Sequence, residues 1–121
     1  MTRTGIVVFG HGSSVASAND AVRAVAASAA RQGGWPLYET AFLECAPKLN
    51  AAVEKLAQAG AGEVLVLPYF LTLGIHLQRD LPKIVADLTE QFGIAIRVAP
   101  PLDGHPDLGR MLVDRAREAA Q

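Results

Sequence analysis

The stretch Ile6-Val7-Val8-Phe9-Gly10 is a short apolar run that ends on a glycine. Its length and its β-branched residues are typical of a strand that is buried on both faces of a sheet. The same pattern returns in Glu63-Val64-Leu65-Val66-Leu67 and, less regularly, in residues 37–43 and 94–98. We therefore predict four short strands that are spread along the whole chain.

Helical patterns separate these strands. Apolar residues recur there at intervals of three and four, which is the spacing of an amphipathic helix. In the third helical segment, Asp80 is the expected N-cap and Pro82 lies in the first turn, so residues 69–79 are expected to form a loop. The expected helices begin near Ser17, at Pro47, at Asp80 and at Pro106.

The predicted elements alternate as strand and helix from beginning to end. This order indicates an α/β fold, a doubly wound four-stranded parallel sheet with helices on both faces. Right-handed crossovers favour the strand order 2-1-3-4, a shortened flavodoxin-like sheet. We interpret residues 1–121 as one domain, because the length suits one hydrophobic core. Ligands of such sheets bind beyond the carboxyl ends of the strands, here between strands 1 and 3.

Composition excludes several classes of protein. The formal net charge is -1, from 11 basic and 12 acidic residues, so no basic field favours nucleic acid as a partner. Cys45 is the only cysteine, which rules out an internal disulfide and favours a reducing, cytoplasmic environment. The apolar run after Met1 is too short for a signal peptide or a membrane span. No membrane association is expected.

Chemically active side chains follow three of the predicted strands. His11 follows the first strand, Glu44 the second and His76 the third. Two histidines and a carboxylate form a suitable site for a divalent metal ion, and neutral imidazoles also accept protons. A single histidine after a strand is more often a loop residue, and a single glutamate is more often a solvated acid. The functional prediction therefore depends on the two histidines together, because they follow strands 1 and 3, which flank the expected ligand site.

The loop after the first strand allows a second interpretation. Its glycine-flanked sequence, residues 10–14, precedes a helix and could hold an anion with backbone N–H groups. Ser13 and Ser14 are therefore candidate substrate-binding residues. Tyr69 and Phe70 are candidates for the apolar floor of a flat ligand, and Arg79 for pairing with its carboxylates.

Several motifs together resemble a known family, the sirohydrochlorin chelatases, which insert cobalt or iron in cobalamin and sirohaem synthesis. Related small members insert nickel. The resemblance covers nearly the whole chain in the right order, and the stretch from Pro68 to Pro82 is its most specific part. It rests on His11-Gly12-Ser13, Phe42-Leu43-Glu44 with Pro47, Leu67-Pro68-Tyr69-Phe70-Leu71, Gly74-Ile75-His76, Asp80-Leu81-Pro82 and Gly104-His105-Pro106.

The resemblance implies a class II chelatase that inserts Co²⁺, Fe²⁺ or Ni²⁺ into a tetrapyrrole. It implies that His11 and His76 are the catalytic and metal-binding residues and that Glu44 assists at the same site. The metal ion is a substrate, and no further cofactor is implied. Family members often carry arginine after the His-Gly-Ser triplet, where this chain has Ser14, so this position lacks the guanidinium that would pair with a substrate carboxylate.

Two other functions remain open. One is a histidine phosphatase-type enzyme with His11 as the nucleophile. Such enzymes have an arginine directly before the His-Gly pair to hold phosphate, and Gly10 in that position argues strongly against this function. The other is a non-catalytic module that binds a tetrapyrrole or a metal. Ser14 favours this alternative, because it replaces the arginine that family members often carry at this position.

A homodimer is also expected. A tetrapyrrole is broad and flat, and one sheet edge covers only one side of it, so a second subunit would supply the missing wall. The resemblance supports this expectation, because the family also occurs as longer chains with two facing copies of this domain. Residues 69–73 or the final helix are expected to supply apolar contact area.

Overall fold

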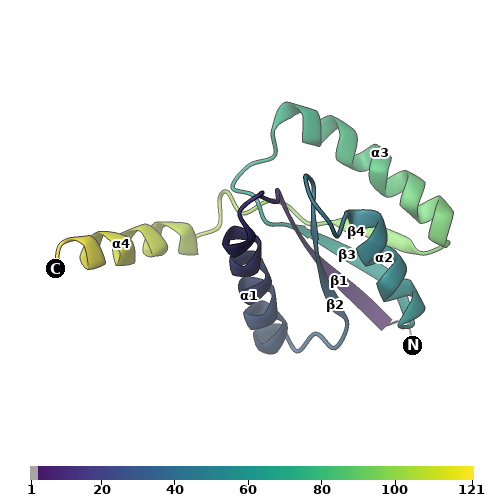
Figure 1. The fold of residues 1–121 in the computed structure, drawn as a ribbon, viewed down its shortest axis with the longest axis horizontal. Helices are drawn as coiled ribbons and strands as arrows, with labels where there is room; N and C mark the ends of the chain where they lie inside the picture. Colours follow the sequence, from purple (N-terminus) through teal and green to yellow (C-terminus); the bar gives the residue numbers. More distant parts are fainter. Residues whose placement is uncertain (1–2) are drawn as a thin grey trace.

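The computed structural model describes residues 3–121 and has the expected parallel sheet. The strand order is β2-β1-β3-β4, so the predicted order 2-1-3-4 is confirmed. The strands are β1 (Arg3–Gly10), β2 (Tyr38–Phe42), β3 (Ala61–Pro68) and β4 (Ala95–Val98). The helices are α1 (Ala16–Gly33), α2 (Leu49–Gln58), α3 (Ile75–Phe92) and α4 (Asp107–Ala119). Strand and helix alternate along the chain, as Figure 1 shows.

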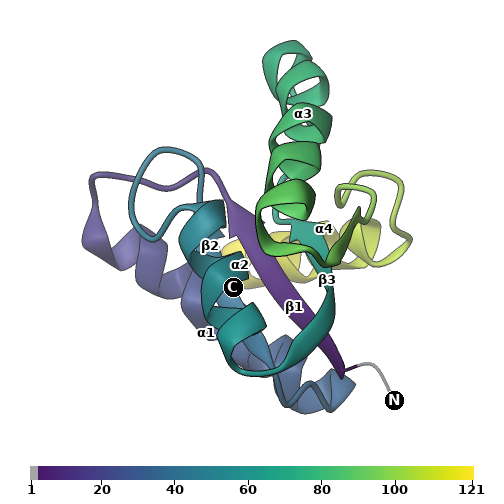
Figure 2. The ribbon, with the colours of Figure 1, turned by 90° about the vertical axis from the view of Figure 1, so that its right-hand side faces the viewer.

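The two central strands hold the core. In β1, Val7 and Phe9 belong to the main hydrophobic cluster, together with Val66 of β3 and buried residues of α2 and α3. Alternate residues of a strand face opposite sides, so Ile6 and Val8 point to the other face, where α1 lies. Figure 2 views the sheet from the side of α2 and α3, with α1 and α4 behind it.

The third helix begins earlier than predicted. Asp80 is not its N-cap, because α3 starts at Ile75 with Gly74 as the N-cap, and Pro82 lies inside the helix. The early start is favoured by packing, since Leu77 and Leu81 are both buried and lie one turn apart on the same face. The correction matters for function, because it places His76 on the first turn of a helix and not in a loop.

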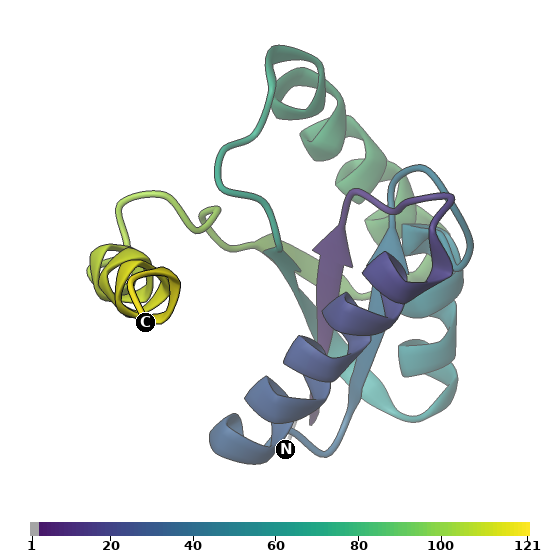
Figure 3. The ribbon, with the colours of Figure 1, turned by 60° about the vertical axis from the view of Figure 1, so that its left-hand side comes forward.

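The last helix stands apart from the rest of the fold. Figures 1 and 3 show α4 extending away from the sheet and from the other three helices. None of its residues is buried, although it has a clear apolar side. Among residues 3–121, no helix is both long enough and apolar enough to cross a membrane.

Candidate functional site

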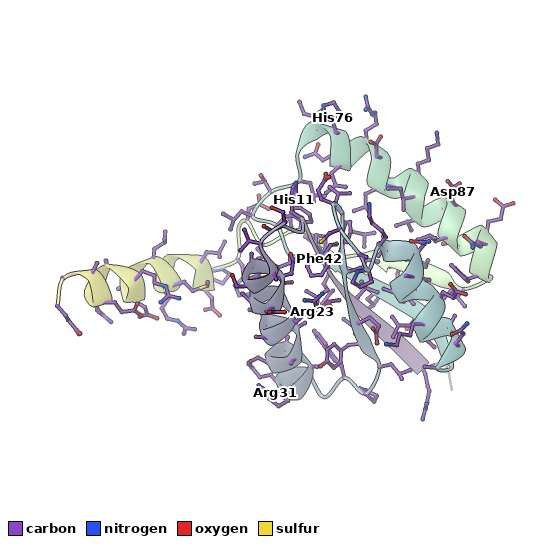
Figure 4. The ribbon with its side chains drawn as sticks, viewed as in Figure 1. His11, Arg23, Arg31, Phe42, His76 and Asp87 are labelled. Atoms are coloured by element: carbon purple, nitrogen blue, oxygen red, sulfur yellow. The ribbon has the colours of Figure 1, made fainter. Side chains whose placement is uncertain are left out.

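A cleft of about 700 Å³ lies beyond the carboxyl ends of β1, β2 and β3. His11, Glu44 and His76 all line it, each from a different segment of the chain. Figure 4 shows His11 just above β1 and His76 at the start of α3, over the same end of the sheet. The three residues that follow the first three strands in the sequence therefore line one cleft, as predicted. Its other lining residues include Leu43, Phe70, Thr72, Ile75 and Asp80.

The loop that carries His11 is held tightly against the segment after β2. The backbone N–H groups of Leu43 and Glu44 donate hydrogen bonds to the carbonyls of Gly10 and His11, at 3.0 and 2.9 Å. These bonds extend the pairing of β1 with β2 past the end of the strands. As a result, Glu44 is fixed beside His11 by the backbone and not by a contact between their side chains.

Gly12 is required where these two segments meet. It has a φ of 88°, and a Cβ built on it would lie 2.8 Å from the Cys45 Sγ and 3.0 Å from the Phe42 Cβ. A side chain at this position would be strained by its backbone conformation and would also collide with its neighbours. The glycine after His11 therefore permits the close approach that shapes the cleft.

Asn19 is a positioning residue that the sequence interpretation missed. Its Oδ1 accepts a hydrogen bond from the Ser13 N–H at 2.9 Å, and its Nδ2 donates to the Ser13 carbonyl at 2.8 Å. One side chain on the first turn of α1 thus holds both polar groups of a loop residue. The available signal was a polar amide at the start of an otherwise apolar helical face, where such side chains commonly bond the nearby backbone.

The partners of His11 indicate its tautomer. Its Nδ1 lies 3.1 Å from the carbonyl oxygen of Gly12, which can only accept a hydrogen bond, so Nδ1 is assigned the proton. The neutral ring then presents an unprotonated Nε2. Phe70 contacts the imidazole edge-on at 6.4 Å between ring centroids and packs in turn on Phe9 at 5.9 Å. His11 is thus oriented by one carbonyl and one aromatic ring.

In His76, the Nδ1 atom accepts a hydrogen bond, whereas in His11 it donates one. Its Nδ1 lies 3.3 Å from the Arg79 Nη2, and a guanidinium can only donate, so this nitrogen is assigned as an acceptor. Arg79 also donates from Nε to the Asp80 carboxylate at 3.2 Å. Arg79 therefore occupies one ring nitrogen of His76 in this conformation.

The predicted metal ligands share a cleft without forming a closed ligand set. Within the part of the chain that the structure describes, no group of three or more His, Cys, Asp and Glu side chains is close enough to hold a metal ion. His11, His76 and Glu44 as joint ligands remain a prediction. Asp80 is an additional carboxylate at the cleft that the sequence interpretation did not assign to the site.

The structure separates the candidate substrate-binding residues. Phe70 lines the cleft, whereas Tyr69 faces a different groove together with residues of α4. The hydroxyl of Ser13 accepts a hydrogen bond from the Val15 N–H at 3.0 Å and so supports the start of α1. Ser14 is exposed beside it, and Arg79 reaches the site through His76.

Comparison with known proteins gives a consistent result over the whole chain. The chain is 29% identical to a sirohydrochlorin cobaltochelatase of Methanopyrus kandleri, over 94% of this chain and 95% of the relative. It is 33% identical to the chloroplastic sirohydrochlorin ferrochelatase of Arabidopsis thaliana, over 92% of this chain. The chain spans 50% of the length of that plant relative.

Solved structures of chelatase-type proteins have the same fold as this chain. A cobalamin (vitamin B12) biosynthesis CbiX protein from Marinobacter aquaeolei VT8 superposes with a TM-score of 0.84 at 28% identity, covering 97% of both chains. The sirohydrochlorin chelatase SirB from Bacillus subtilis subspecies spizizenii, solved with cobalt, shares the fold with a TM-score of 0.88 at 23% identity and is covered over 51% of its length. The CbiX family model matches residues 5–119, and the chain therefore belongs to the CbiX family.

Proposed function

We propose that this chain inserts a divalent metal ion, cobalt or iron, into sirohydrochlorin. The observation that carries the proposal is the cleft that His11, His76 and Glu44 line, on a chain that the CbiX family model matches over residues 5–119. Two relatives of similar sequence are named for this chemistry with cobalt and with iron. Nickel is a further candidate ion, because two imidazoles and a carboxylate suit several divalent ions of the first row.

Metal insertion exchanges two protons for one divalent cation. Two pyrrole N–H protons must leave the ring as the ion forms its bonds to the ring nitrogens, so a base within reach of those protons is needed. The free Nε2 of His11 is the base that the cleft offers, and Glu44 is a second acceptor on the same side. The charge of the ring core is therefore the same before and after insertion, because the two positive charges of the ion replace those of the two protons that leave.

His76 has a complementary role in this proposal. Its Nδ1 is held by Arg79, and release of that guanidinium would free a second imidazole for the incoming ion. A carboxylate on the tetrapyrrole is a better partner for arginine than a neutral ring nitrogen, because the resulting hydrogen bond is assisted by charge. We propose that substrate binding draws Arg79 away, so that His11, His76 and Glu44 can approach the metal ion together. When the ion passes to the ring, the Nε2 of His11 is released from it and can then accept a pyrrole proton.

The decisive experiment follows the absorbance of sirohydrochlorin under anaerobic conditions with Co²⁺ or Fe²⁺ in excess over the protein. We expect many ring conversions per protein molecule, well above the rate without protein. His11→Ala and His76→Ala should abolish this turnover while circular dichroism shows an intact fold. Full turnover in both variants would contradict the proposed mechanism.

Glu44→Gln tests the second acceptor. It should slow insertion less than loss of either histidine, because water can partly replace a carboxylate as a proton acceptor. Asp87→Asn and Arg31→Ala, which change charged side chains remote from the cleft (Figure 4), are matched controls and should retain normal turnover.

A non-catalytic tetrapyrrole-binding module is the second candidate, and Ser14 in place of the arginine common in the family is what favours it. The same assay distinguishes the two functions. A binding module gives a spectral change that stops at one ring per site, whereas a chelatase continues until ring or metal is consumed.

We further propose that the active species is a cytoplasmic homodimer. The cleft lies at one edge of a four-stranded sheet, and a flat tetrapyrrole needs a second wall to be enclosed. A twofold pair is the commonest way in which one kind of chain supplies such a wall. The location is inferred from a composition with a single cysteine. No cofactor other than the metal substrate is proposed, and the choice between cobalamin and sirohaem synthesis follows from the metal used.

A further inference from the structure

The starting observation is one guanidinium that bonds two potential metal ligands at the same time. The Arg79 Nη2 donates to the His76 Nδ1 at 3.3 Å, and its Nε donates to the Asp80 Oδ1 at 3.2 Å. An imidazole nitrogen and a carboxylate oxygen both bind divalent ions of the first transition row. The two donor atoms therefore already share one cation, which the protein itself supplies.

The helix places these two donors at a useful spacing. His76 and Asp80 are four residues apart near the start of α3, so their side chains are neighbours on one face of the helix. The metal-binding motif H-E-x-x-H places two ligands of one zinc ion on a helix at the same interval. Both residues line the cleft that also holds His11. One ion at the edge of the cleft could therefore bind both side chains.

Arg79 holds these two donors only loosely. The side chains of Arg79 and Asp80 are 68% and 55% exposed, and exposed ion pairs of this kind are weak. Their bond of 3.2 Å is also longer than the 2.7–2.9 Å that is roughly usual for charge-assisted hydrogen bonds. A divalent ion carries twice the charge of a guanidinium and would bind the same two atoms directly. The ion can therefore replace Arg79.

We infer that His76 and Asp80 form a loading site, which receives the divalent ion before the ring takes it up. Arg79 occupies this loading site until the ion arrives. Asp80 is then a metal ligand in addition to the proposed ligands His11, His76 and Glu44. The inference rests on the proposed function, because it describes how the metal substrate enters the same cleft.

A site with only two protein donors suits an ion that must move on. Among residues 3–121, no group of three or more His, Cys, Asp and Glu side chains is close enough to hold a metal ion. The remaining positions around an ion at the loading site would be filled by water. The ion would thus lose its water in steps, first to His76 and Asp80 and then to the other ligands and the ring nitrogens.

The loading site also couples the two substrates through Arg79. An ion that displaces the guanidinium leaves it free to pair with a carboxylate of the tetrapyrrole, a bond that is assisted by charge. By linkage, ring binding then strengthens metal binding by the same factor. Arg79 should therefore oppose binding of the metal alone and support binding of the ring. Loss of one side chain should have opposite effects on the two substrates.

The first test measures Co²⁺ binding by isothermal titration calorimetry without a tetrapyrrole. Asp80→Asn should weaken binding roughly tenfold, the lower end of what one contact to a charged group contributes. Arg79→Ala should strengthen it roughly two- to fivefold, because an exposed competing pair is removed. Unchanged Co²⁺ affinity in Asp80→Asn, with circular dichroism showing an intact fold, would overturn the inference.

Two variants on the same helix are matched controls. Asp87→Asn removes a carboxylate from α3 at a distance from the cleft, as Figure 4 shows. Lys83→Ala removes a positive charge one turn after Arg79. Both should leave the Co²⁺ affinity unchanged. If Lys83→Ala strengthened binding as much as Arg79→Ala, the effect would be one of general charge, and competition at the loading site would be refuted.

The second test identifies the ligand atom and does not depend on the stability of the Asp80 variant. Zn²⁺ serves as a diamagnetic probe, and the ¹⁵N chemical shifts of the imidazole nitrogens are followed by NMR. The chain has three histidines, so each ring can be assigned. The shift of the His76 Nδ1 should change on addition of Zn²⁺, and at a lower concentration in Arg79→Ala. No change at this nitrogen would refute the loading site.

Failure of this inference can be distinguished from failure of the proposed function. Co²⁺ binding that responds to both variants as expected, without sirohydrochlorin turnover, would overturn the function and retain the loading site. Normal turnover together with an unchanged Co²⁺ affinity in Asp80→Asn would overturn the loading site and retain the function.

Discussion

Replacing Gly12 with alanine tests the architecture of the site most directly. The residue has a φ of 88°, and the new methyl group would lie 2.8 Å from the Cys45 Sγ and 3.0 Å from the Phe42 Cβ. Holding an L-residue in this region costs roughly 1–2 kcal/mol. Forcing a methyl group into a well-packed position costs about 1–3 kcal/mol more. Phe42 is fully buried and cannot move aside, so the full cost of about 2–5 kcal/mol is expected.

Gly34→Ala separates the two contributions. Gly34 has a φ of 66°, but a Cβ there would meet nothing within 4 Å, so this variant carries the conformational cost alone. Urea denaturation should therefore show a loss of about 1–2 kcal/mol for Gly34→Ala and a distinctly larger loss for Gly12→Ala. The midpoint of thermal unfolding should fall by roughly 10 °C for Gly12→Ala, given the size of the domain.

A double variant tests whether contact with the Cys45 side chain causes the loss of stability. Adding Cys45→Ala to Gly12→Ala removes the nearest obstructing atom, so part of the lost stability should return. Sirohydrochlorin turnover should fall in Gly12→Ala even under conditions where the protein is folded, because the new side chain displaces the loop that carries His11. Equal destabilisation by Gly12→Ala and Gly34→Ala would show that the loop after β1 does not pack on the segment after β2 as described.

Three further substitutions test single contacts. Asn19→Ala should cost about 1–2 kcal/mol in urea denaturation and reduce turnover, because it removes both hydrogen bonds to the Ser13 backbone; unchanged turnover would show that this clamp does not position the site. Leu81→Ala should cost about 2–5 kcal/mol in urea denaturation, because the side chain is 2% exposed; a loss below 1 kcal/mol would contradict the packing of α3 on the sheet. Arg79→Ala should raise the KM for sirohydrochlorin roughly fivefold with a smaller effect on kcat, since an exposed ion pair is worth about 1 kcal/mol; a pure kcat effect would instead indicate that Arg79 acts only through His76.

The sheet could be predicted because its strands differ strongly from their surroundings. Residues 6–9 and 64–67 are short apolar runs that end at Gly10 and Pro68, and few other structures suit such runs. Once four strands alternate with helices, the preference for right-handed crossovers leaves few topologies. The meeting of His11 and His76 at one cleft follows from that topology, since both residues come after neighbouring strands.

The start of α3 could not be predicted from local signals. Asp80 and Pro82 look like the first turn of a helix, and Gly74 has no side chain to act as a cap. The helix extends back to Ile75 because Leu77 gains burial in the core, which is a tertiary effect that outweighs the local preference. The pairing of Arg79 with His76 depends on this earlier start, because only a helix brings residues three apart onto one face.

The direction of α4 could not be predicted from the sequence either. Its amphipathic spacing predicts a helix with one buried side, and in a single chain that side would be expected to pack on its own sheet. The outward course is set by backbone hydrogen bonds from Leu102 and Asp103 to the loop after β3, and backbone bonds of this kind leave no mark on residue type. Periodicity shows that a helix needs a partner surface but not which chain provides it.

The loop after β3 contacts both His11 and the segment that leads to α4. The Tyr69 N–H donates to the Phe9 carbonyl at 2.7 Å, which continues the sheet, and the next two carbonyls hold the segment that leads to α4. Between these bonds, Phe70 places its ring against His11. One short stretch therefore fixes the orientation of a proposed catalytic imidazole and the direction of α4. Because both are fixed by adjacent residues, a change that shifts this loop should alter the orientation of His11 and the direction of α4 together.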